Sequence, residues 1–459
     1  MSYKTYAAPK SISRRGFLAG SAAVVGAAMS LPGTALGQAE GQLLLWLPGG
    51  SDLFCKIHTG LLDGFSTKAS LGPATTVCGL GQDTEFTQAL IGSITAGSPP
   101  DISMLWDSPV SLGAQGAFMA LDDMMKGSKI DISTWPKGLL SSCQFKGATY
   151  GLPVTAGVYS MWYNEELFEA KGIPSDRASF PKTWAEMRKL SKEFTVWDGD
   201  DLKSAGFMPN RIPETMAIWS ALNGGMLFDE ANLKYTLDSE QNIEMMSIFL
   251  EWLDEEYKGD VNLIDRSGSF KEAYPDGETG AGPAFREGRQ AGLMSGSWLM
   301  GDIYADPVPT FTRWNQAPNP VGPSGSASVS GTWPNWFVIP IGSKNPQAAF
   351  DYLTYLAIEG SVEWYQQIPD VPTNSQVAVK PPNSLIEHRG QAFAEDLTAF
   401  IATQAAIVTP MWNSPVQSFG NDQMARAMEK IYTHAQPVAE ALAEAQAAAQ
   451  AELERVLAG

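Results

Sequence analysis

The stretch from Phe145 to Trp184 constrains the fold most, because several local signals follow one another in it. Residues Val158 to Tyr163 are β-branched and aromatic, which predicts a strand. Asn164 precedes two glutamates and predicts a helix N-cap, since the helix dipole favours negative charge in the first turn. A Gly-Ile-Pro run predicts the end of that helix, and Thr183 predicts the start of the next.

The first 37 residues are interpreted as a twin-arginine signal peptide. Ser13–Leu18 reads S-R-R-G-F-L, an apolar run follows, and Ala35–Gly37 offers small residues for cleavage before Gln38. A transmembrane anchor is the alternative, but the run is too short and too rich in glycine and alanine to span a bilayer. We therefore expect a periplasmic protein exported by the twin-arginine pathway, without a lipid anchor because no cysteine follows the run.

The net charge of -19 argues against nucleic acid and anionic membrane surfaces as partners. The chain has only three histidines, and their spacing is not that of a metal site or a catalytic triad. The acidic run Asp198–Asp201 lacks the full calcium-loop pattern. We predict no catalytic residue, no metal and no cofactor.

Three cysteines occur, so at least one is unpaired in a monomer. Cys55 and Cys78 could pair in an oxidising compartment, but their spacing alone leaves open whether they are bonded or are small buried thiols.

Residues Gly41 to Leu47 form an apolar run that predicts a buried parallel strand. Ligands of open α/β sheets bind at the carboxyl ends of strands, which is where Trp46 and Asp52 fall. Helices are predicted over 53–65, 83–96 and 439–458 from their helical spacing of apolar residues.

Three strings in this chain resemble the extracellular solute-binding proteins of sugar ABC transporters, the maltose-binding-protein-like group. They are Y-G-L-P…V-Y-S-M-W-Y-N-E-E-L-F-E-A-K-G-I-P…P-K-T-W from Tyr150, P-P-D-I-S-M-L-W-D from Pro99, and F-R-E-G-R-Q-A-G-L-M-S-G-S-W from Phe285. Weaker matches, such as N-P-Q-A-A-F from Asn345, follow in the same order and cover essentially the whole mature chain.

The resemblance implies an α/β, two-lobed periplasmic-binding-protein (Venus-flytrap) fold. Each lobe would be a mostly parallel sheet flanked by helices, and three crossings would join the lobes. Lobe 1 would comprise residues 38–152 plus 335–370, and lobe 2 would comprise residues 153–334 plus 371–459.

The resemblance also implies that aromatic platforms and polar groups line a ligand cleft between the lobes. The residues expected there are Trp46, Asp52, Trp106, Asp107, Tyr159, Trp219, Trp298, Trp333, Trp336, Trp412 and Asn413. For Trp46 and Trp219 a core position is an equal alternative, and Trp106 with Asp107 could be a packed ring and a capping carboxylate. Trp333 and Trp336 depart from the family pattern and either tailor the pocket or repack the hinge.

The expected function is that of the substrate-binding component of an ABC importer, which binds a mono- or oligosaccharide and delivers it to the transmembrane permease subunits. The protein is expected to be a monomer and not an enzyme. The alternatives are a non-sugar solute, such as a polyol or a glycerol phosphodiester, and a secreted carbohydrate-active enzyme with a carboxylate pair across the cleft. The identity of the sugar and any chemoreceptor role stay open.

Overall fold

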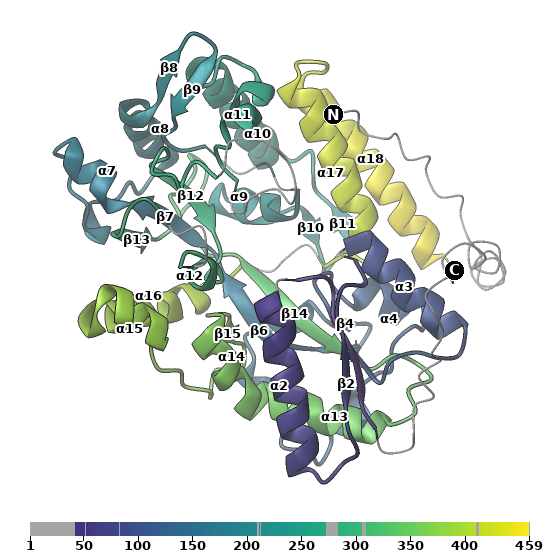
Figure 1. The fold of residues 1–459 in the computed structure, drawn as a ribbon. Coiled ribbons are helices and arrows are strands. Elements are labelled where there is room, and N and C mark those ends of the chain that lie inside the picture. Colours follow the sequence, from purple (N-terminus) through teal and green to yellow (C-terminus); the bar gives the residue numbers. More distant parts are fainter. Residues whose placement is uncertain are drawn as a thin grey trace.

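The computed structural model describes residues 42–50, 52–81, 83–208, 211, 213–271, 283–304, 309–409 and 413–458 (Figure 1). The predicted signal peptide lies outside the described residues, and so does Trp412.

A six-stranded sheet forms the centre of one half of the molecule. In spatial order its strands are β15 (Val371–Pro372), β6 (Leu152–Val158), β14 (Thr332–Val338), β3 (Ile102–Leu105), β1 (Leu44–Trp46) and β2 (Thr75–Val77). The predicted parallel strand is confirmed, because β1 pairs in parallel with both β2 and β3.

The expectation of a mostly parallel sheet is wrong for these strands, because β14 runs antiparallel to both β3 and β6, and β15 runs antiparallel to β6. The sheet is mixed. Parallel neighbours need a long crossover connection, usually through a helix, whereas β14 enters this sheet directly from the other half of the molecule.

A three-stranded antiparallel sheet lies in the other half, in the order β12 (Gly292–Ser295), β7 (Ser160–Asn164) and β13 (Trp314–Ala317). Side chains alternate along β7: Met161 and Tyr163 pack into one hydrophobic cluster, and Trp162 packs into another on the opposite face. Helices therefore cover both faces of this sheet.

Three hydrophobic clusters accordingly define two lobes. Lobe 1 is built around a core drawn from residues between Leu43 and Val154 and between Trp336 and Trp364. Lobe 2 is built around the two clusters on either side of β7, which draw on residues between Val158 and Ala317 and between Leu385 and Leu453. Strands β6 and β14 run side by side from the middle of the molecule into lobe 1 (Figure 1).

The helices of lobe 1 surround the six-stranded sheet. They are α2 (Asp52–Lys68), α3 (Asp83–Thr95), α4 (Val110–Ala114), α5 (Asp122–Met125), α6 (Lys137–Ser141), α13 (Pro346–Tyr355) and α14 (Ser361–Gln367). Those of lobe 2 are α7 (Glu165–Ala170), α8 (Trp184–Phe194), α9 (Met216–Leu222), α10 (Glu240–Glu256), α11 (Val261–Ser267), α12 (Leu299–Asp302), α15 (Asn383–Arg389), α16 (Gln391–Ala405), α17 (Gln417–Tyr432) and α18 (Val438–Leu457). Short hairpins complete the fold: β4 (Gln144–Phe145) with β5 (Ala148–Thr149), β8 (Val196–Asp198) with β9 (Asp201–Ser204), and β10 (Phe228–Asp229) with β11 (Lys234–Tyr235).

The helix starts predicted from the sequence are confirmed by their capping bonds. The Asn164 side chain accepts from the backbone N–H groups of Glu166 (2.9 Å) and Leu167 (3.2 Å) at the start of α7. The Thr183 hydroxyl accepts from the backbone N–H of Glu186 (3.2 Å), whose side chain returns to the Thr183 N–H, which completes a capping box at α8. The predicted helices over 53–65, 83–96 and 439–458 correspond to α2, α3 and α18.

The open question about the cysteines is settled in lobe 1. Cys55 of α2 and Cys78, just after β2, form a disulfide with their Cα atoms 6.1 Å apart. Cys143 is free and fully buried, and burial raises the pKa of its thiol well above the usual range. The disulfide therefore links the first helix of lobe 1 covalently to the β2 edge of its sheet.

Candidate functional site

One face of the strands that join the lobes collects polar and small side chains. Gly157 and Thr155 of β6 pair with Trp333 and Asn335 of β14. Directly paired residues on neighbouring strands project to the same face, so these four belong to one face. Because β15 pairs Pro372 with Thr155, Asp370 projects from the same side two residues earlier. We call this surface the hinge face: Thr155, Gly157, Trp333, Asn335 and Asp370.

Lobe 2 places the ring of Trp298 directly on the hinge face. Trp298 is the N-cap of α12 and is half-buried. A Cβ added to Gly157 or to Gly296 would lie 2.0 Å from carbon atoms of its indole, so the ring rests on both glycines. The ring of Tyr159 meets the indole edge-on, with centroids 5.2 Å apart. Glycine is required at both positions because this backbone approaches an aromatic ring.

Lobe 1 contributes Trp106, which follows β3. Its indole Nε1 donates to the Oδ1 atom of Asn335 at 3.2 Å. The Asn335 amide in turn donates to the Thr155 hydroxyl (3.0 Å) and to a carboxylate oxygen of Asp370 (3.0 Å). Trp106 is half-buried against Phe54, with ring centroids 5.9 Å apart. The hinge face therefore meets tryptophans from both lobes.

Two predicted residues lie at the same end of the lobe 1 sheet as Trp106. Trp46 ends β1 and is half-buried against the lobe 1 core, and Asp52 is exposed in the first turn of α2. Asp107 is half-buried beside Trp106. The carboxyl ends of β1 and β3 share one edge because these strands are parallel neighbours.

Three of the predicted aromatic site residues need correction, because they are core side chains. Tyr159 is 3% exposed and belongs to the core of lobe 2. Trp219 is fully buried in lobe 2 between Trp184 and Phe249, with ring centroids 5.9 and 5.5 Å away. Trp336 is 1% exposed in the lobe 1 core, where its Nε1 donates to the Ser142 hydroxyl at 2.7 Å. Trp336 directly follows Asn335 in β14, and successive side chains of a strand point to opposite faces, so Trp336 points away from the hinge face.

Asn413 is also placed differently from the prediction. It is buried, and its amide donates to a carboxylate oxygen of Glu230 (2.7 Å) and contacts the hydroxyl of Ser141 at 3.4 Å. Glu230 follows β10 of lobe 2 and Ser141 ends α6 of lobe 1, so this is a contact between lobes. Burial raises the pKa of the Glu230 carboxyl above its ordinary value, which the Asn413 and Ser141 hydrogen bonds partly oppose. In Figure 1 the β10–β11 hairpin and α12 lie on opposite sides of β14.

Sequence reasoning missed the polar members of the hinge face. Thr155, Asn335 and Asp370 are all buried, each beside apolar or aromatic residues in the chain. A polar residue within an apolar crossing strand is the one signal that could have identified them, since buried polar groups are normally hydrogen-bonded.

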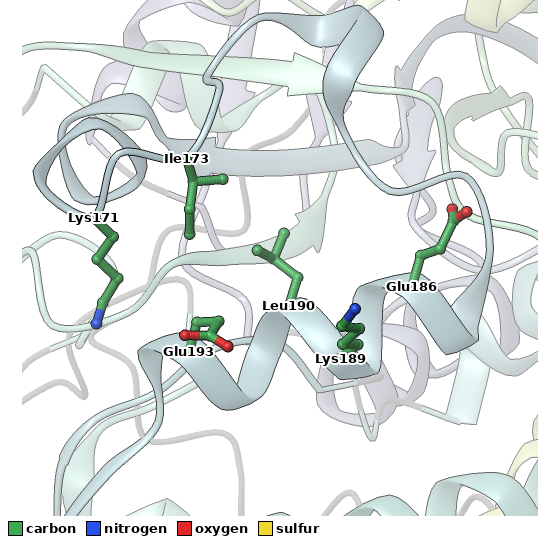
Figure 2. A pocket seen from close by; sticks show the side chains of 6 residues that line it. All are labelled: Lys171, Ile173, Glu186, Lys189, Leu190 and Glu193. Atoms are coloured by element: carbon green, nitrogen blue, oxygen red, sulfur yellow. The ribbon is translucent and has the colours of Figure 1, made fainter.

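A separate pocket lies on lobe 2, away from the hinge face (Figure 2). It is an open groove between α8 and the segment after α7, lined by Lys171, Ile173, Glu186, Lys189, Leu190 and Glu193. Its charges are mixed and exposed, and Glu186 belongs to the capping box. We assign no function to it.

Within the described part of the chain, no helix is long and apolar enough to cross a membrane. The same residues contain no group of three or more histidine, cysteine or acidic side chains arranged to hold a metal ion. The polar side chains of the hinge face donate or accept hydrogen bonds, and the large side chains around them are aromatic.

Residues 70–388 match the family described as bacterial extracellular solute-binding protein, which is well over half of the chain. The chain belongs to this family. Among its relatives, the lactose-binding protein of Rhizobium radiobacter is 22% identical over 278 residues, which cover 59% of each protein. Matches to the curated relatives span about three fifths of those relatives' own length.

Solved structures resemble this solute-binding protein over most of its length. CpMnBP1 with mannobiose bound has a TM-score of 0.69 at 22% identity and covers 89% of this chain and 99% of its own. The maltose/maltodextrin-binding domain MalE from Bdellovibrio bacteriovorus, bound to maltotriose, has a TM-score of 0.68 at 16% identity, with 90% and 100% covered. The chain therefore has the two-lobed α/β fold of periplasmic sugar-binding proteins, as the sequence resemblance implied.

Proposed function

We propose that this solute-binding protein is the substrate-binding component of an ABC importer and binds a mono- or oligosaccharide against the hinge face. The observation that carries the proposal is the meeting of Trp298 and Trp106, from different lobes, on one hydrogen-bonding strand surface. A sugar has an apolar C–H face and a rim of hydroxyls, so it needs flat aromatic platforms and fixed polar partners.

The energetic requirement fits two or three platforms. Burial of ~80–100 Å² of a sugar face on one tryptophan contributes roughly 2 kcal/mol. A micromolar ligand needs roughly 8 kcal/mol, so polar groups must supply the remainder. Asp52 and Asp107 are our candidates for that role, with Trp46 and Trp333 as further contacts.

The remaining expectations belong to the same proposal. The partners are the transmembrane permease subunits of the importer, and the protein acts as a monomer in the periplasm after twin-arginine export. It performs no catalysis, in keeping with a family of binding proteins. We retain lobe limits at 152/153, 334/335 and 370/371 as a proposal. A non-sugar solute, such as a polyol, is the second candidate for the ligand.

The test is a thermal-shift panel of mannobiose, maltotriose, lactose, polyols, sugar phosphates and amino acids. A compound at about 100 times its dissociation constant stabilises the protein by about 2.7 kcal/mol, which is readily visible. We expect a shift that is confined to one class of saccharide. A response to polyols or anionic compounds alone would support a solute-binding function but refute a saccharide as the ligand.

We expect Gly157→Ala to weaken binding of the responding saccharide by about tenfold. The new methyl group would lie 2.0 Å from carbon atoms of Trp298, so the indole must leave its position. Isothermal titration calorimetry measures the change. The matched control is Gly64→Ala in α2, where an added Cβ meets nothing within 4 Å. Equal affinity of both variants would contradict the placement of the ligand on this ring.

A further inference from the structure

The orientation of the Asn335 amide follows from its partners. A carboxylate only accepts hydrogen bonds, so the atom of Asn335 that lies 3.0 Å from Asp370 must be the amide nitrogen. The same nitrogen donates to the Thr155 hydroxyl at 3.0 Å. The carbonyl end is then the acceptor for the indole N–H of Trp106 at 3.2 Å. Each end of this one side chain therefore has a distinct task.

This amide and its two anchors belong to neighbouring segments that join the lobes. Asn335 lies on β14, Thr155 on β6, and Asp370 directly before β15. All three are at most 6% exposed, so water competes little for their hydrogen bonds. Trp106, in contrast, is half-buried and follows β3 of lobe 1. The hydrogen bond from Trp106 therefore ties a partly exposed ring to the buried strands of the hinge.

We propose that Asn335 is a positioning residue for ligand binding. It holds the indole of Trp106 at a fixed orientation relative to the strands that join the lobes. This inference rests on the proposed function, because it assumes that the Trp106 ring is a platform for the saccharide. A platform that is already oriented loses less conformational freedom when a ligand binds, and this favours affinity. The role passes through a single bond, between the Nε1 of Trp106 and the Oδ1 of Asn335.

A double-mutant cycle on that bond tests the proposal. Trp106→Phe keeps an aromatic ring but removes the indole N–H, and Asn335→Leu removes the acceptor. Affinities for mannobiose, maltotriose and lactose are measured by calorimetry for the wild type, both single variants and the double variant. We expect Asn335→Leu to weaken binding about tenfold in the wild type but to change it little in the Trp106→Phe background, where the bond is already absent.

A spectroscopic measurement in the absence of sugar separates a local change at Trp106 from a general loss of stability. In Asn335→Leu we expect the indole N–H resonance of Trp106 to shift, while that of Trp197, on β8 of lobe 2, stays unchanged. The matched control is Asn242→Leu, which removes another buried asparagine that donates two hydrogen bonds, to Met226 (2.9 Å) and Thr236 (2.7 Å). It should lower stability without changing affinity.

The outcomes are distinguishable. If the wild type binds a saccharide but the two substitutions weaken binding additively, Asn335 does not act through Trp106, and the inference fails while the function stands. An unchanged Trp106 resonance in Asn335→Leu overturns it in the same way. If the wild type binds no saccharide, the proposed function fails and this role fails with it. Non-additive losses of affinity together with a shifted Trp106 resonance support the positioning role of Asn335.

Discussion

Trp298→Ala is expected to weaken saccharide binding about 100-fold, or roughly 2.7 kcal/mol. The indole rests on Gly157 and Gly296, which fix its position, and it is half-buried, so part of its surface reaches solvent. Truncation removes the platform, and because the indole also packs against both clusters of lobe 2, a moderate loss of stability should accompany the loss of affinity. Calorimetric titration with the responding saccharide gives the affinity, and urea unfolding gives the stability.

A matched tryptophan on lobe 2 provides the control. Trp197 is half-buried, with its Nε1 donating to the backbone carbonyl of Glu256 at 3.0 Å and Lys258 above its ring. Trp197→Ala should therefore change stability modestly and leave affinity unchanged. Loss of stability in Trp298→Ala with unchanged affinity would mark Trp298 as a structural residue and remove it from the proposed site.

The second large effect is expected from His58→Leu, which should make the protein markedly less sensitive to acid. His58 is fully buried in lobe 1, with ring centroids of Trp364 at 4.3 Å and Phe54 at 4.5 Å. Neither ring nitrogen has a hydrogen-bond partner among the described residues. Burial lowers the pKa of this imidazole from 6.5 to about 3, so the folded protein holds it neutral.

The direction in which stability changes with pH follows from proton linkage. Below pH ~6.5 the unfolded chain binds a proton at His58 that the folded protein does not bind, so stability falls as the pH falls toward the folded pKa. The loss is about 1.4 kcal/mol per pH unit, or roughly 2.7 kcal/mol by pH ~4.5. The free energy of unfolding is measured with urea near neutral pH and near pH ~4.5. Between these two pH values the wild type should lose about 2.7 kcal/mol more than His58→Leu loses.

His388 supplies the comparison for this experiment, because it is an exposed histidine of α15. His388→Gln should leave the acid dependence of stability close to that of the wild type. If His58→Leu loses stability in acid as steeply as the wild type, the buried imidazole is not the group that takes up the proton.

Much of the local structure could be predicted from the sequence. Asn164 and Thr183 cap the helices that they were expected to cap, because a capping bond joins residues only two or three positions apart. The long apolar and amphipathic runs became β1, α2, α3 and α18 for the same reason: their periodicity is a property of the chain itself. The order of motifs also sufficed to indicate the two-lobed fold.

The residues of the hinge face could be predicted only in part, and their role in ligand binding stays a proposal. Trp298 and Trp106 do meet on the hinge face, whereas Trp219 and Trp336 are core residues with the same side chain. A tryptophan looks the same in a sequence whether it faces solvent or core. Asn413 likewise carries a polar amide that either a ligand or other protein groups could satisfy, and here Glu230 of the same lobe and Ser141 of lobe 1 accept from it.

The sequence by itself determined several of the helices, the caps at Asn164 and Thr183, the order of the crossing strands and the family. Only the tertiary structure decided the sheet directions, the Cys55–Cys78 bond and the residues that share the hinge face. The physical reason is separation along the chain: Trp106 and Asn335 lie 229 positions apart, and their hydrogen bond exists only because β3 and β14 are neighbours in one sheet. Local signals extend over a few residues, whereas burial and long-range hydrogen bonds depend on how distant segments pack.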